Sequence, residues 1–366
     1  MPDASGKSNF AGKTSFKRGR KVELMAITIK DLAKLANVSK GTVSRVINGS
    51  SGVGAETRQR ILKLIKDLDY QPNISARGLA AKRSYNIGMI IPHTGNYSLS
   101  SSYWSALLTA VNEQVMARGY NLLFSTARAQ DDVASSYRTI LKRRCADGLI
   151  IGADQFGEEH LAELLTMDFP FVTVGKTPNN SVYYVDVDNR GGARQMTEYL
   201  LDQGHRKIAL LTGPLEYPYV QERIQGFSQV MMAAGLSPHQ IFHCPYQIQA
   251  AKEKTKDLLK LFPETTAIFA ACSELVWGVI KAAQEMKIKI PDDLSLVSFD
   301  DHPLFEVFSP EITAVSQRIN EVGRTAAERL FELVEGAVPA QKGIVLSTEI
   351  IVRRSCANRC KSSHPH

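Results

Sequence analysis

Long apolar runs are missing from this sequence, and cysteine is scarce. No stretch of the 366 residues approaches the ~18 consecutive apolar residues that a membrane-spanning helix requires, so we expect no membrane partner. The N-terminus lacks the apolar core of a secretory signal, and we therefore predict a cytoplasmic protein. The cysteines are odd in number and include no C-x-x-C pair, which favours reduced thiols over a disulfide framework: Cys145, Cys244, Cys272, Cys356 and Cys360.

Common catalytic motifs are also missing. The sequence contains no G-x-S-x-G, no P-loop and no H-E-x-x-H, and the G-x-G at Gly52–Gly54 follows no predicted strand, which excludes a dinucleotide fingerprint. Residues 356–366 contain four Cys and His side chains, but nothing in the pattern orders them, so we interpret this segment as a disordered tail without a metal. We predict that the protein is not an enzyme and needs no cofactor.

What the sequence does have is a basic N-terminal quarter. Residues 1–83 contain 17 Lys and Arg against 6 Asp and Glu, a net charge of +11, whereas residues 84–366 contain 27 against 31, a net charge of −4. The positive excess extends beyond the run at residues 13–21 into periodic, foldable sequence, so a solvated charge run does not explain it. This asymmetry predicts that the N-terminal part binds a polyanion such as nucleic acid.

Residues 1–26 are interpreted as a disordered basic arm, because residues 1–24 are rich in Gly, Ser and Lys and show no apolar period. Two hypotheses account for the arm. Either Met25 is the native start and the preceding residues come from an upstream start codon, or the arm adds nonspecific affinity for DNA. The intact mass of protein made from its native gene separates the two.

Residues 27–72 carry three short helical patterns. The first begins after Thr28, a capping residue with Asp31 three positions later, and ends at Asn37, which tolerates a left-handed backbone. The second follows the capping residue Ser39, and the third lies within AETRQRILKLIKDLDY. The apolar side chains expected inside this unit are Ile29, Leu32, Ala33, Leu35, Ala36, Val43, Val46, Ile47, Ile61, Leu64, Ile65 and Leu68.

The remainder of the chain changes in character after a linker. Residues 73–84 are Ala-rich and basic with few apolar side chains, and we interpret them as a linker or hinge helix that folds against a partner. From residue 85 to 355, apolar strands alternate with amphipathic helices in two series, the second starting at YYVDVD. This pattern predicts parallel sheets covered on both faces and arranged as two similar α/β lobes. Such lobes bind small molecules beyond the carboxyl ends of their strands, in the cleft between them.

One motif in the basic part is specific. In A-x-x-x-N-V-S-x-x-T-V-S-R-V-x-N, Ala33 lets two helices approach, Val38 packs between them and Val43 anchors the second helix, whose exposed N-terminal face suits the major groove. A compact three-helix bundle without a DNA role is the alternative, and the charge bias disfavours it.

With this motif, the chain resembles the lactose/galactose/purine repressor family. The resemblance rests on TIKDLAKLANVSKGTVSRVING, YQPNISARGLAAKRS, GHRKIALLTGP, ERIQGF, LSLVSFDD and the terminal RRS, which occur in the family's order from about Thr28 to Ser355. It implies an all-α helix-turn-helix headpiece, a hinge helix and a two-lobed core resembling periplasmic binding proteins, with three chain crossings between lobes. It also places residues 85–185 and about 317–342 in one lobe, and residues 186–313 and 344–355 in the other.

The resemblance implies a double-stranded DNA operator, with contacts from Thr28, Lys40, Gly41, Thr42, Ser44, Arg45, Asn48, Thr57 and Leu79. Arg45 is suited to a bidentate bond with guanine, whereas Thr42 and Thr57 are suited to phosphates. Leu79 matches the leucine that relatives insert into the minor groove, where it kinks the duplex. Gly41 has no side chain for reading a base, and Ala80 stands where some relatives have lysine.

The resemblance also implies a small-molecule effector, a sugar or sugar derivative, contacted by Tyr103, Trp104, Asp154, Arg223, Ser273 and Asp300. From the residues alone, simpler interpretations are a surface salt bridge for Arg223, a helix cap for Asp300 and a core position for Trp104. Relatives commonly have Asn-Asp or Ser-Asp where this chain has Cys272–Ser273, and Lys176 follows Gly175, near which relatives often have an acid. This loss of acceptors and gain of a cation disfavours a simple neutral sugar and favours a phosphorylated or acidic sugar, although a solvent-exposed Lys176 explains the lysine equally well.

The sequence therefore predicts an effector-controlled transcriptional regulator, a repressor that binds a palindromic operator as a homodimer. The tetramerising member of the family that this chain resembles has a C-terminal leucine heptad tail, and CANRCKSSHPH has none, so the resemblance implies a dimer. The alternatives are a sugar-binding transport protein or an α/β enzyme without a DNA role. Both leave the basic headpiece unexplained.

Overall fold

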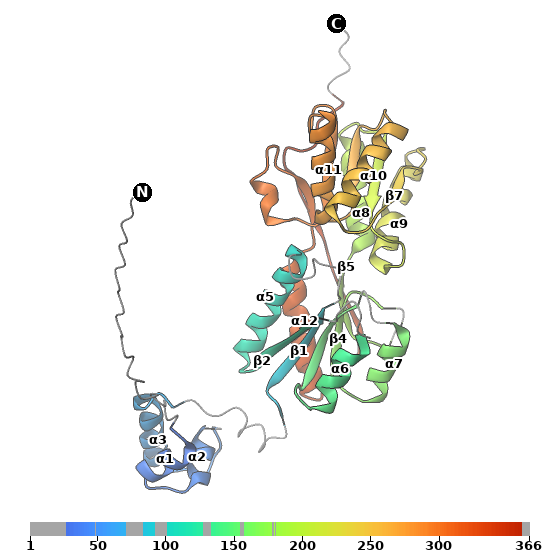
Figure 1. The fold of residues 1–366 in the computed structure, drawn as a ribbon. Coiled ribbons are helices and arrows are strands. Elements are labelled where there is room, and N and C mark those ends of the chain that lie inside the picture. The colour runs from blue at the N-terminus through green and yellow to red at the C-terminus, as the bar shows by residue number, and fades with distance from the viewer. Residues whose placement is uncertain are drawn as a thin grey trace, which may run out of the picture. The chain divides into compact units, whose positions relative to one another are not determined.

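A computed structural model describes residues 27–47, 49–70, 83–91, 101–126, 133–153, 157–177, 179 and 181–360. The chain divides into two compact units, residues 1–81 and 82–366. The first is an all-α headpiece, and the second is a core built on two six-stranded sheets (Figure 1). The expected fold class is confirmed. The interpreted arm at residues 1–26 and the end of the tail lie outside the described residues.

The headpiece contains three helices, as the apolar periods predict: α1 (Ile29–Leu35), α2 (Lys40–Ile47) and α3 (Ala55–Asp67). Thr28 and Asp31 form a capping box, in which the Thr28 N–H donates to the Asp31 carboxylate at 3.0 Å. Asn37 adopts the expected left-handed backbone, with φ of 50°. The Ser39 hydroxyl then accepts a hydrogen bond from the Thr42 N–H at 3.1 Å and caps α2.

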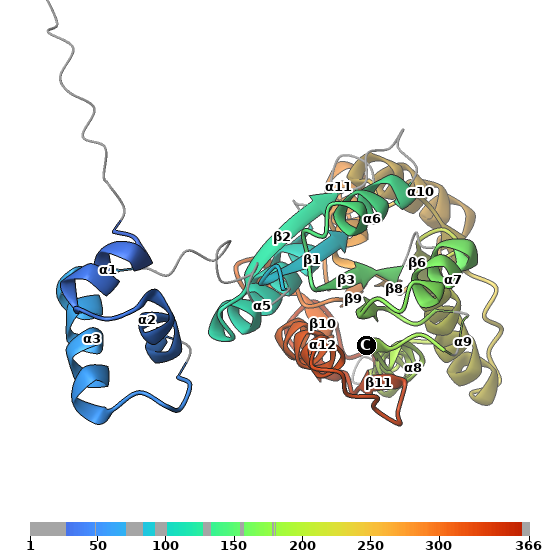
Figure 2. The same cartoon turned by 90° about the horizontal axis from the view of Figure 1, so that it is seen from below.

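Figure 2 shows the helices of the headpiece grouped together. A small core joins them, in which Leu32, Val43 and Ile61 are fully buried. Leu35 was also expected in this core, and that expectation is wrong, because Leu35 is 60% exposed. The inward stripe of α1 follows Ile29, Leu32, Ala33 and Ala36, the positions i, i+3, i+4 and i+7, and Leu35 falls outside it.

The first sheet of the core has the strand order β11-β5-β4-β3-β1-β2, and all its pairs are parallel. Alternate strand residues face opposite layers, with α5 and α12 on one face and α6 and α7 on the other (Figure 1). The elements of this lobe are β1 (Asn86–Ile91), α5 (Ser102–Ala117), β2 (Asn121–Thr126), α6 (Val133–Lys142), β3 (Gly148–Gly152), α7 (Glu158–Thr166), β4 (Phe171–Val174), β5 (Tyr184–Val187), α12 (Ile319–Val334) and β11 (Gly343–Leu346).

The second sheet has the order β12-β10-β9-β8-β6-β7 and is parallel except for the β10–β12 pair. Helices α8 and α9 cover one face, and α10 and α11 cover the other. The elements are α8 (Asn189–Asp202), β6 (Ile208–Thr212), α9 (Pro218–Ala233), β7 (Ile241–His243), α10 (Ile248–Leu261), β8 (Ala267–Ala270), α11 (Ser273–Met286), β9 (Ser295–Phe299), the 3-10 helix η3 (Pro303–Glu306), β10 (Thr313–Ser316) and β12 (Glu349–Ile351).

The chain passes between the sheets three times, after β5, β10 and β11, as expected. Two lobe assignments were wrong. The segment YYVDVD contributes β5 to the first sheet, and residues 344–346 belong to β11, which also lies in the first sheet beside β5. Both strands have four residues, and their apolar pattern does not specify a partner. The choice of sheet is made by the backbone pairing of Tyr184 with Gly343.

The segment after Ser355 was also wrongly interpreted as disordered from residue 356. The Arg359 N–H donates to the Gln203 carbonyl at 2.7 Å, and its guanidinium donates to the carbonyls of Asp292 and Asp293. Residues 356–360 are therefore attached to the second lobe by hydrogen bonds to its backbone, which composition alone cannot reveal. Among the described residues, none of the helices has the length and apolar content to cross a membrane.

Close packing of α8 against α9 depends on Gly226. A Cβ at this position would lie 2.2 Å from the backbone carbonyl oxygen of Arg190, so the helices would have to separate. We expect Gly226→Ala to lower the free energy of unfolding by about 1–3 kcal/mol, measured by denaturant titration. Gly157→Ser is the matched control, because a Cβ there meets only the flexible Glu159 side chain at 3.9 Å. Equal stability of the two variants would contradict this account of the packing.

Candidate functional sites

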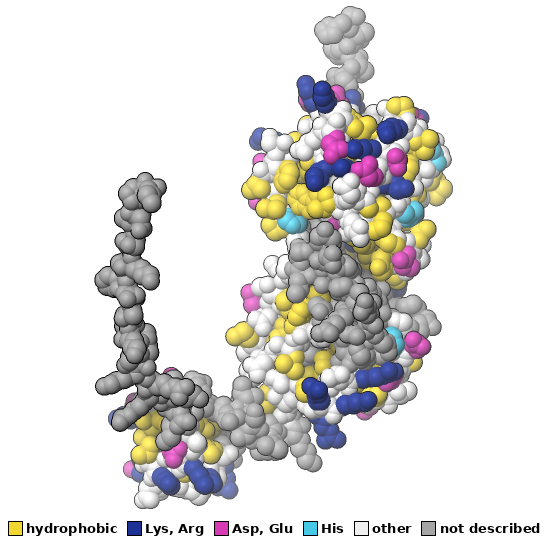
Figure 3. Space-filling model, in the orientation of Figure 1, with side chains coloured by type: hydrophobic (Ala, Val, Ile, Leu, Met, Phe, Trp, Pro, Cys, Tyr) yellow, Lys and Arg dark blue, Asp and Glu magenta, His cyan; other side chains and the backbone are white. Residues whose placement is uncertain are grey.

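The exposed side of α2 is the candidate DNA-reading face. Burial of Val43 and Val46 fixes the rotation of the helix and leaves Lys40, Gly41 and Arg45 exposed. Figure 3 shows Lys and Arg side chains gathered on the visible surface of the headpiece. Thr42 and Ser44 are half-buried, and the Thr42 hydroxyl lies 2.9 Å from the Ser39 hydroxyl. The structure thus brings five of the predicted DNA contacts onto one short helix.

The remaining predicted DNA contacts are distributed differently. Thr28 is exposed, but its hydroxyl donates to the Asp31 carboxylate at 2.6 Å, so it has a capping role of its own. Thr57 is half-buried in the first turn of α3. Asn48 and Leu79 lie outside the described residues, as does most of the predicted linker at 73–84.

Gly41 has no packing reason to be glycine. A Cβ there would meet only the Ser39 hydroxyl oxygen at 3.7 Å, an ordinary contact. Glycine inside a helix costs about 1 kcal/mol relative to alanine. Because packing within the headpiece does not require glycine here, we infer that its missing side chain leaves room for another molecule to approach the backbone of α2 closely.

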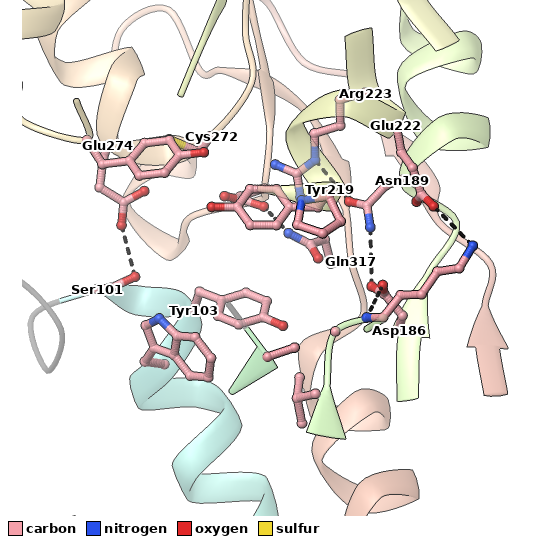
Figure 4. A pocket seen from close by; sticks show the side chains of 18 residues that line it. Ser101, Tyr103, Asp186, Asn189, Tyr219, Glu222, Arg223, Cys272, Glu274 and Gln317 are labelled. Carbon is pink, nitrogen blue, oxygen red and sulfur yellow. Dashed lines mark hydrogen bonds and ion pairs between the residues drawn. The ribbon is translucent and has the colours of Figure 1, made fainter. Parts of the chain in front are cut away.

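The second candidate site is a cleft at the carboxyl ends of the strands, lined from both lobes (Figure 4). Polar and aromatic groups converge on it. From the first lobe come Ser101, Tyr103, Trp104, Lys176 and Asp186, and from the second come Asn189, Tyr219, Glu222, Arg223, Tyr246, Glu274 and Asp300. Gln317, on the crossing that follows β10, also lines the cleft.

Arg223 projects from α9 toward the cleft, although it is only 4% exposed. Its Nε donates to the Asn189 Oδ1 at 2.9 Å, and its Nη1 donates to the Ala271 carbonyl. The guanidinium carbon lies 3.7 Å from the centre of the Phe299 ring, a cation–π contact. These three contacts hold the guanidinium plane in one orientation, which excludes the surface salt bridge that the sequence alone suggested.

Asp300 follows β9 with φ of 80°, a left-handed conformation that residues other than glycine rarely adopt. Its carboxylate accepts hydrogen bonds from the Gln317 amide and from the Ser273 N–H, the latter at 3.4 Å. Burial raises its pKa to about 6, against the opposing effect of nearby Arg223. A strained, buried carboxylate beside a cleft is the kind of feature that functional sites retain.

Polar contacts between side chains join the lobes at the cleft. The Ser101 hydroxyl of the first lobe donates to the Glu274 Oε1 of the second at 2.9 Å. The Lys176 Nζ lies 3.5 Å from the Glu222 Oε1. Lys176 is solvent-exposed, as one interpretation of the sequence had it, and it also forms this ion pair.

Aromatic rings supply flat walls to the cleft. Tyr103 and Trp104, on the first turn of α5, meet edge to face with ring centres 5.1 Å apart, and Trp104 is 7% exposed. On the second lobe, the Tyr217 ring stacks on the Tyr219 ring and on the Tyr246 ring, with ring centres 5.5 and 6.2 Å apart. Rings of this kind bind the apolar faces of sugars and flat heterocycles.

The structure brings Tyr103, Trp104, Arg223 and Asp300 together, as the resemblance implied. Ser273 is 2% exposed and lies behind the wall of the cleft, which its neighbours Cys272 and Glu274 line instead. Asp154 lies outside the described residues. Sequence reasoning missed other polar and aromatic residues that line the cleft, namely Ser101, Asp186, Asn189, Tyr219, Glu222, Tyr246, Glu274 and Gln317.

The positions of Asp186, Asn189 and Glu222 in the sequence could have indicated their place in the cleft. Asp186 and Asn189 lie at the carboxyl end of β5, and the carboxyl ends of parallel strands form the ligand-binding edge of such sheets. Glu222 directly precedes Arg223 on α9.

Comparison with known proteins decides the identity. Residues 28–73 match the family model for bacterial regulatory proteins of the lacI family, and residues 197–356 match a periplasmic binding protein-like domain. The ribose operon repressor of Halalkalibacterium halodurans is 31% identical over 328 residues, which cover 90% of this chain and 96% of the repressor. The chain belongs to the LacI family.

Solved structures of LacI-family regulators agree with this assignment. A complex of the transcriptional regulator CelR with cellobiose is 28% identical, covers 90% of this chain and 99% of that one, and has a TM-score of 0.69. The Lac repressor dimer bound to operator and an anti-inducer has a TM-score of 0.79 with the same coverage, and at 24% identity it supports the fold alone. This LacI-family chain is a transcriptional regulator and not an enzyme, since the matching relatives are regulators over nearly their whole length.

Proposed function

We propose that this regulator is a repressor that binds a palindromic operator as a homodimer, and that an uncharged, hydroxyl-rich molecule in the cleft controls its affinity for that operator. One observation carries the proposal. Arg223 and Asp300, a donor and an acceptor from one lobe, line the same cleft as Tyr103 and Trp104 from the other. Only a ligand that touches both lobes uses both sets of groups, and such a ligand favours the arrangement in which both are within reach.

The DNA-binding part of the proposal rests on α2. Its N-terminal face carries Lys40, Gly41 and Arg45, and helix-turn-helix proteins place this part of the recognition helix in the major groove. In a dimer, two such helices would read half-sites about one helical turn or a multiple apart. Leu79 as a wedge in the minor groove, and Asn48, Thr28 and Thr57 as further contacts, remain proposals of the family resemblance.

The charge of the cleft favours a ligand without negative charge. Four carboxylates line it (Asp186, Glu222, Glu274 and Asp300) against two cations, Lys176 and Arg223. The Lys176 ammonium is already paired with Glu222, and the positive charge of Arg223 acts on Asp300. A phosphorylated or acidic sugar would add negative charge to a cleft that already has more carboxylates than cations, and the like charges would repel. We therefore propose an uncharged saccharide as the effector, in place of the phosphorylated or acidic sugar that Lys176 suggested in the sequence.

A thermal-shift screen tests this part of the proposal. Uncharged mono- and disaccharides are compared with their phosphorylated and uronate counterparts at equal concentration. A ligand at 100 times its Kd adds about 2.7 kcal/mol to the free energy of unfolding, so a true effector raises Tm visibly. We expect stabilisation by an uncharged saccharide, and its addition should change the affinity of the protein for an operator selected from random duplex DNA. Stabilisation by phosphorylated sugars alone would contradict the assigned ligand class.

Asp300 makes effector binding depend on pH. Its pKa of about 6 lies above the ordinary value of 3.8, so the empty cleft holds a protonated carboxyl at pH 5 and a carboxylate at pH 7.5. Ligand hydroxyls donate to the carboxylate and favour the charged form, so binding should release a proton and strengthen as pH rises through 6. We expect an affinity about tenfold weaker at pH 5 than at pH 7.5, measured by calorimetry. Asp300→Asn should bind the effector weakly at both pH values. If this variant kept the pH profile of the wild type, a group other than Asp300 would be responsible for the pH dependence.

A further inference from the structure

Five residues form a closed ring of polar contacts that crosses the hinge of the core. Lys176 follows β4 of the first lobe, Asp186 lies on β5, Asn189 begins α8, and the adjacent pair Glu222–Arg223 lies on α9 of the second lobe. The ring runs from the Lys176 backbone through Asp186 and Asn189 to Arg223, and returns from Glu222 to the Lys176 side chain (Figure 4).

Each contact of the ring has a defined donor and acceptor. The Lys176 N–H donates to the Asp186 Oδ2 at 2.8 Å, and the Asn189 Nδ2 donates to the Asp186 Oδ1 at 3.2 Å. The Arg223 Nε donates to the Asn189 Oδ1 at 2.9 Å. The ring closes through the Lys176 Nζ and the Glu222 Oε1, 3.5 Å apart.

Asn189 is chemically specified at its position. Its side chain must accept from a guanidinium on one side and donate to a carboxylate on the other, and a carboxamide does both. Aspartate would set two carboxylates against each other. An apolar side chain would remove one hydrogen bond from each neighbour, although the Asp186 carboxylate would still accept from the Val187 N–H at 2.7 Å and Arg223 would still donate to the Ala271 carbonyl. Asn189 is 1% exposed, so water cannot replace the missing partners without entering the core.

Arg223 is the member of the ring through which a ligand acts. Its guanidinium lines the cleft, and a ligand that bonds to the Nη atoms and shifts the guanidinium would lengthen the Nε bond to Asn189. Loss of that bond would weaken the hold of Asn189 on Asp186, and with it the position of the carboxylate that accepts the Lys176 N–H. The same displacement would move the neighbouring Glu222 relative to the Lys176 ammonium.

We propose that this ring behaves as one cooperative unit that couples the position of Arg223 to the contact between the lobes, with Asn189 as its positioning residue. The inference rests on the proposed function in one respect, namely that the effector occupies the cleft. Its physical warrant is a continuous chain of three charge-assisted hydrogen bonds between the two lobes, closed by the Lys176–Glu222 ion pair, since bonds of this kind strengthen one another.

Hydrogen exchange at the Lys176 amide tests the proposal in full-length protein without any ligand. In Asn189→Ala, which does not touch that amide, exchange should become about tenfold faster because the carboxylate that accepts the amide loses one of its donors and is held by the Val187 N–H alone on that side. Arg223→Lys, which removes the bond to Asn189 from the far side, should have the same effect. Glu222→Gln keeps its shape, leaves the buried members intact and opens the ring at the ion pair, so it should accelerate exchange about threefold.

The control is Glu198→Gln, which breaks an exposed pair with Arg194 on the same helix α8 (3.7 Å) and should leave the Lys176 amide unchanged. Circular dichroism verifies that each variant is folded. Unchanged exchange in folded Asn189→Ala or in Glu222→Gln would overturn the ring as a unit. Because no ligand is present, this outcome is independent of the saccharide screen: a screen without hits overturns the proposed effector while leaving a positive exchange result standing.

Discussion

The affinity of this regulator for its operator is expected to fall about 10⁴- to 10⁵-fold between 50 and 200 mM salt. A dimer with the basic headpiece described above would neutralise about 8–10 phosphates, which corresponds to a slope of about −7 to −9 in a plot of log K against log salt. Residues 1–83 carry a net charge of +11 per chain, and Lys40 and Arg45 lie exposed on α2. Fluorescence anisotropy of a labelled operator over a salt series measures the slope. A slope shallower than about −3 would contradict docking of two headpieces.

A variant that starts at Met25 separates the contribution of the folded headpiece from that of the arm. It lacks six Lys and Arg residues per chain, all within residues 1–24. If the arm binds phosphates, the truncated protein should show a slope that is less steep by about one for each phosphate that the arm neutralises. An unchanged slope would instead support the hypothesis that the arm lies outside the functional protein.

The identity of the bases read by α2 is tested with two variants of one residue. Arg45→Ala should cost about 1–3 kcal/mol at one base pair of each half-site, because it removes a bidentate bond to guanine. Arg45→Lys keeps the charge but not the planar fork, so it should retain the salt slope and lose discrimination at that base pair. Equal discrimination by wild type and Arg45→Lys would remove Arg45 from the reading face.

The other large expected effect is in the cleft. Arg223→Ala should weaken effector binding by about 10- to 150-fold, which corresponds to the ~1.5–3 kcal/mol that a charged hydrogen bond to a desolvated ligand oxygen contributes. Because Arg223 also donates to Asn189 and to the Ala271 carbonyl, the variant should unfold at a lower temperature as well. Calorimetry with the saccharide found by screening measures the affinity below that temperature.

Arg190→Ala is the matched control for this experiment. Arg190 lies on α8 of the same lobe, is exposed, and donates from its guanidinium to the Gln229 Oε1 at 2.9 Å, away from the residues that line the cleft. The variant should bind the effector like wild type. If Arg223→Ala binds the saccharide as tightly as Arg190→Ala does, the cleft is not the effector site.

Much of the headpiece could be predicted from the sequence because its signals are local. The capping box of Thr28 and Asp31, the left-handed Asn37 and the cap at Ser39 each depend on residues within three or four positions of one another. The rotation of α2 follows from the period of Val43 and Val46, and it exposes Lys40 and Arg45 without reference to any distant residue. The exposed Leu35 shows the limit of such periods at a helix end, where an apolar residue can lie beside the stripe rather than in it.

The cleft was predictable only in part. Arg223 and Asp300 were identified through the family resemblance, whereas their orientation depends on the Phe299 ring and on Gln317, which are distant from Arg223 in the sequence. Asp186 and Asn189 carried no motif of their own, and in ERIQGF only Arg223, not Glu222, was singled out. Their importance arises from contacts between elements, and residue periodicity contains no information about such contacts.

The sequence by itself determined the class of the two units: three short helices with a basic face, the first two with side-chain caps, then alternating strands and helices that require covered parallel sheets. Tertiary structure alone decided which sheet receives β5 and β11, that Lys176 pairs with Glu222 and that Arg223 is buried. The physical reason is range. Caps and amphipathic periods act within a few residues, whereas strand pairing, burial and charge pairing depend on groups that only the folded chain brings within a few ångströms.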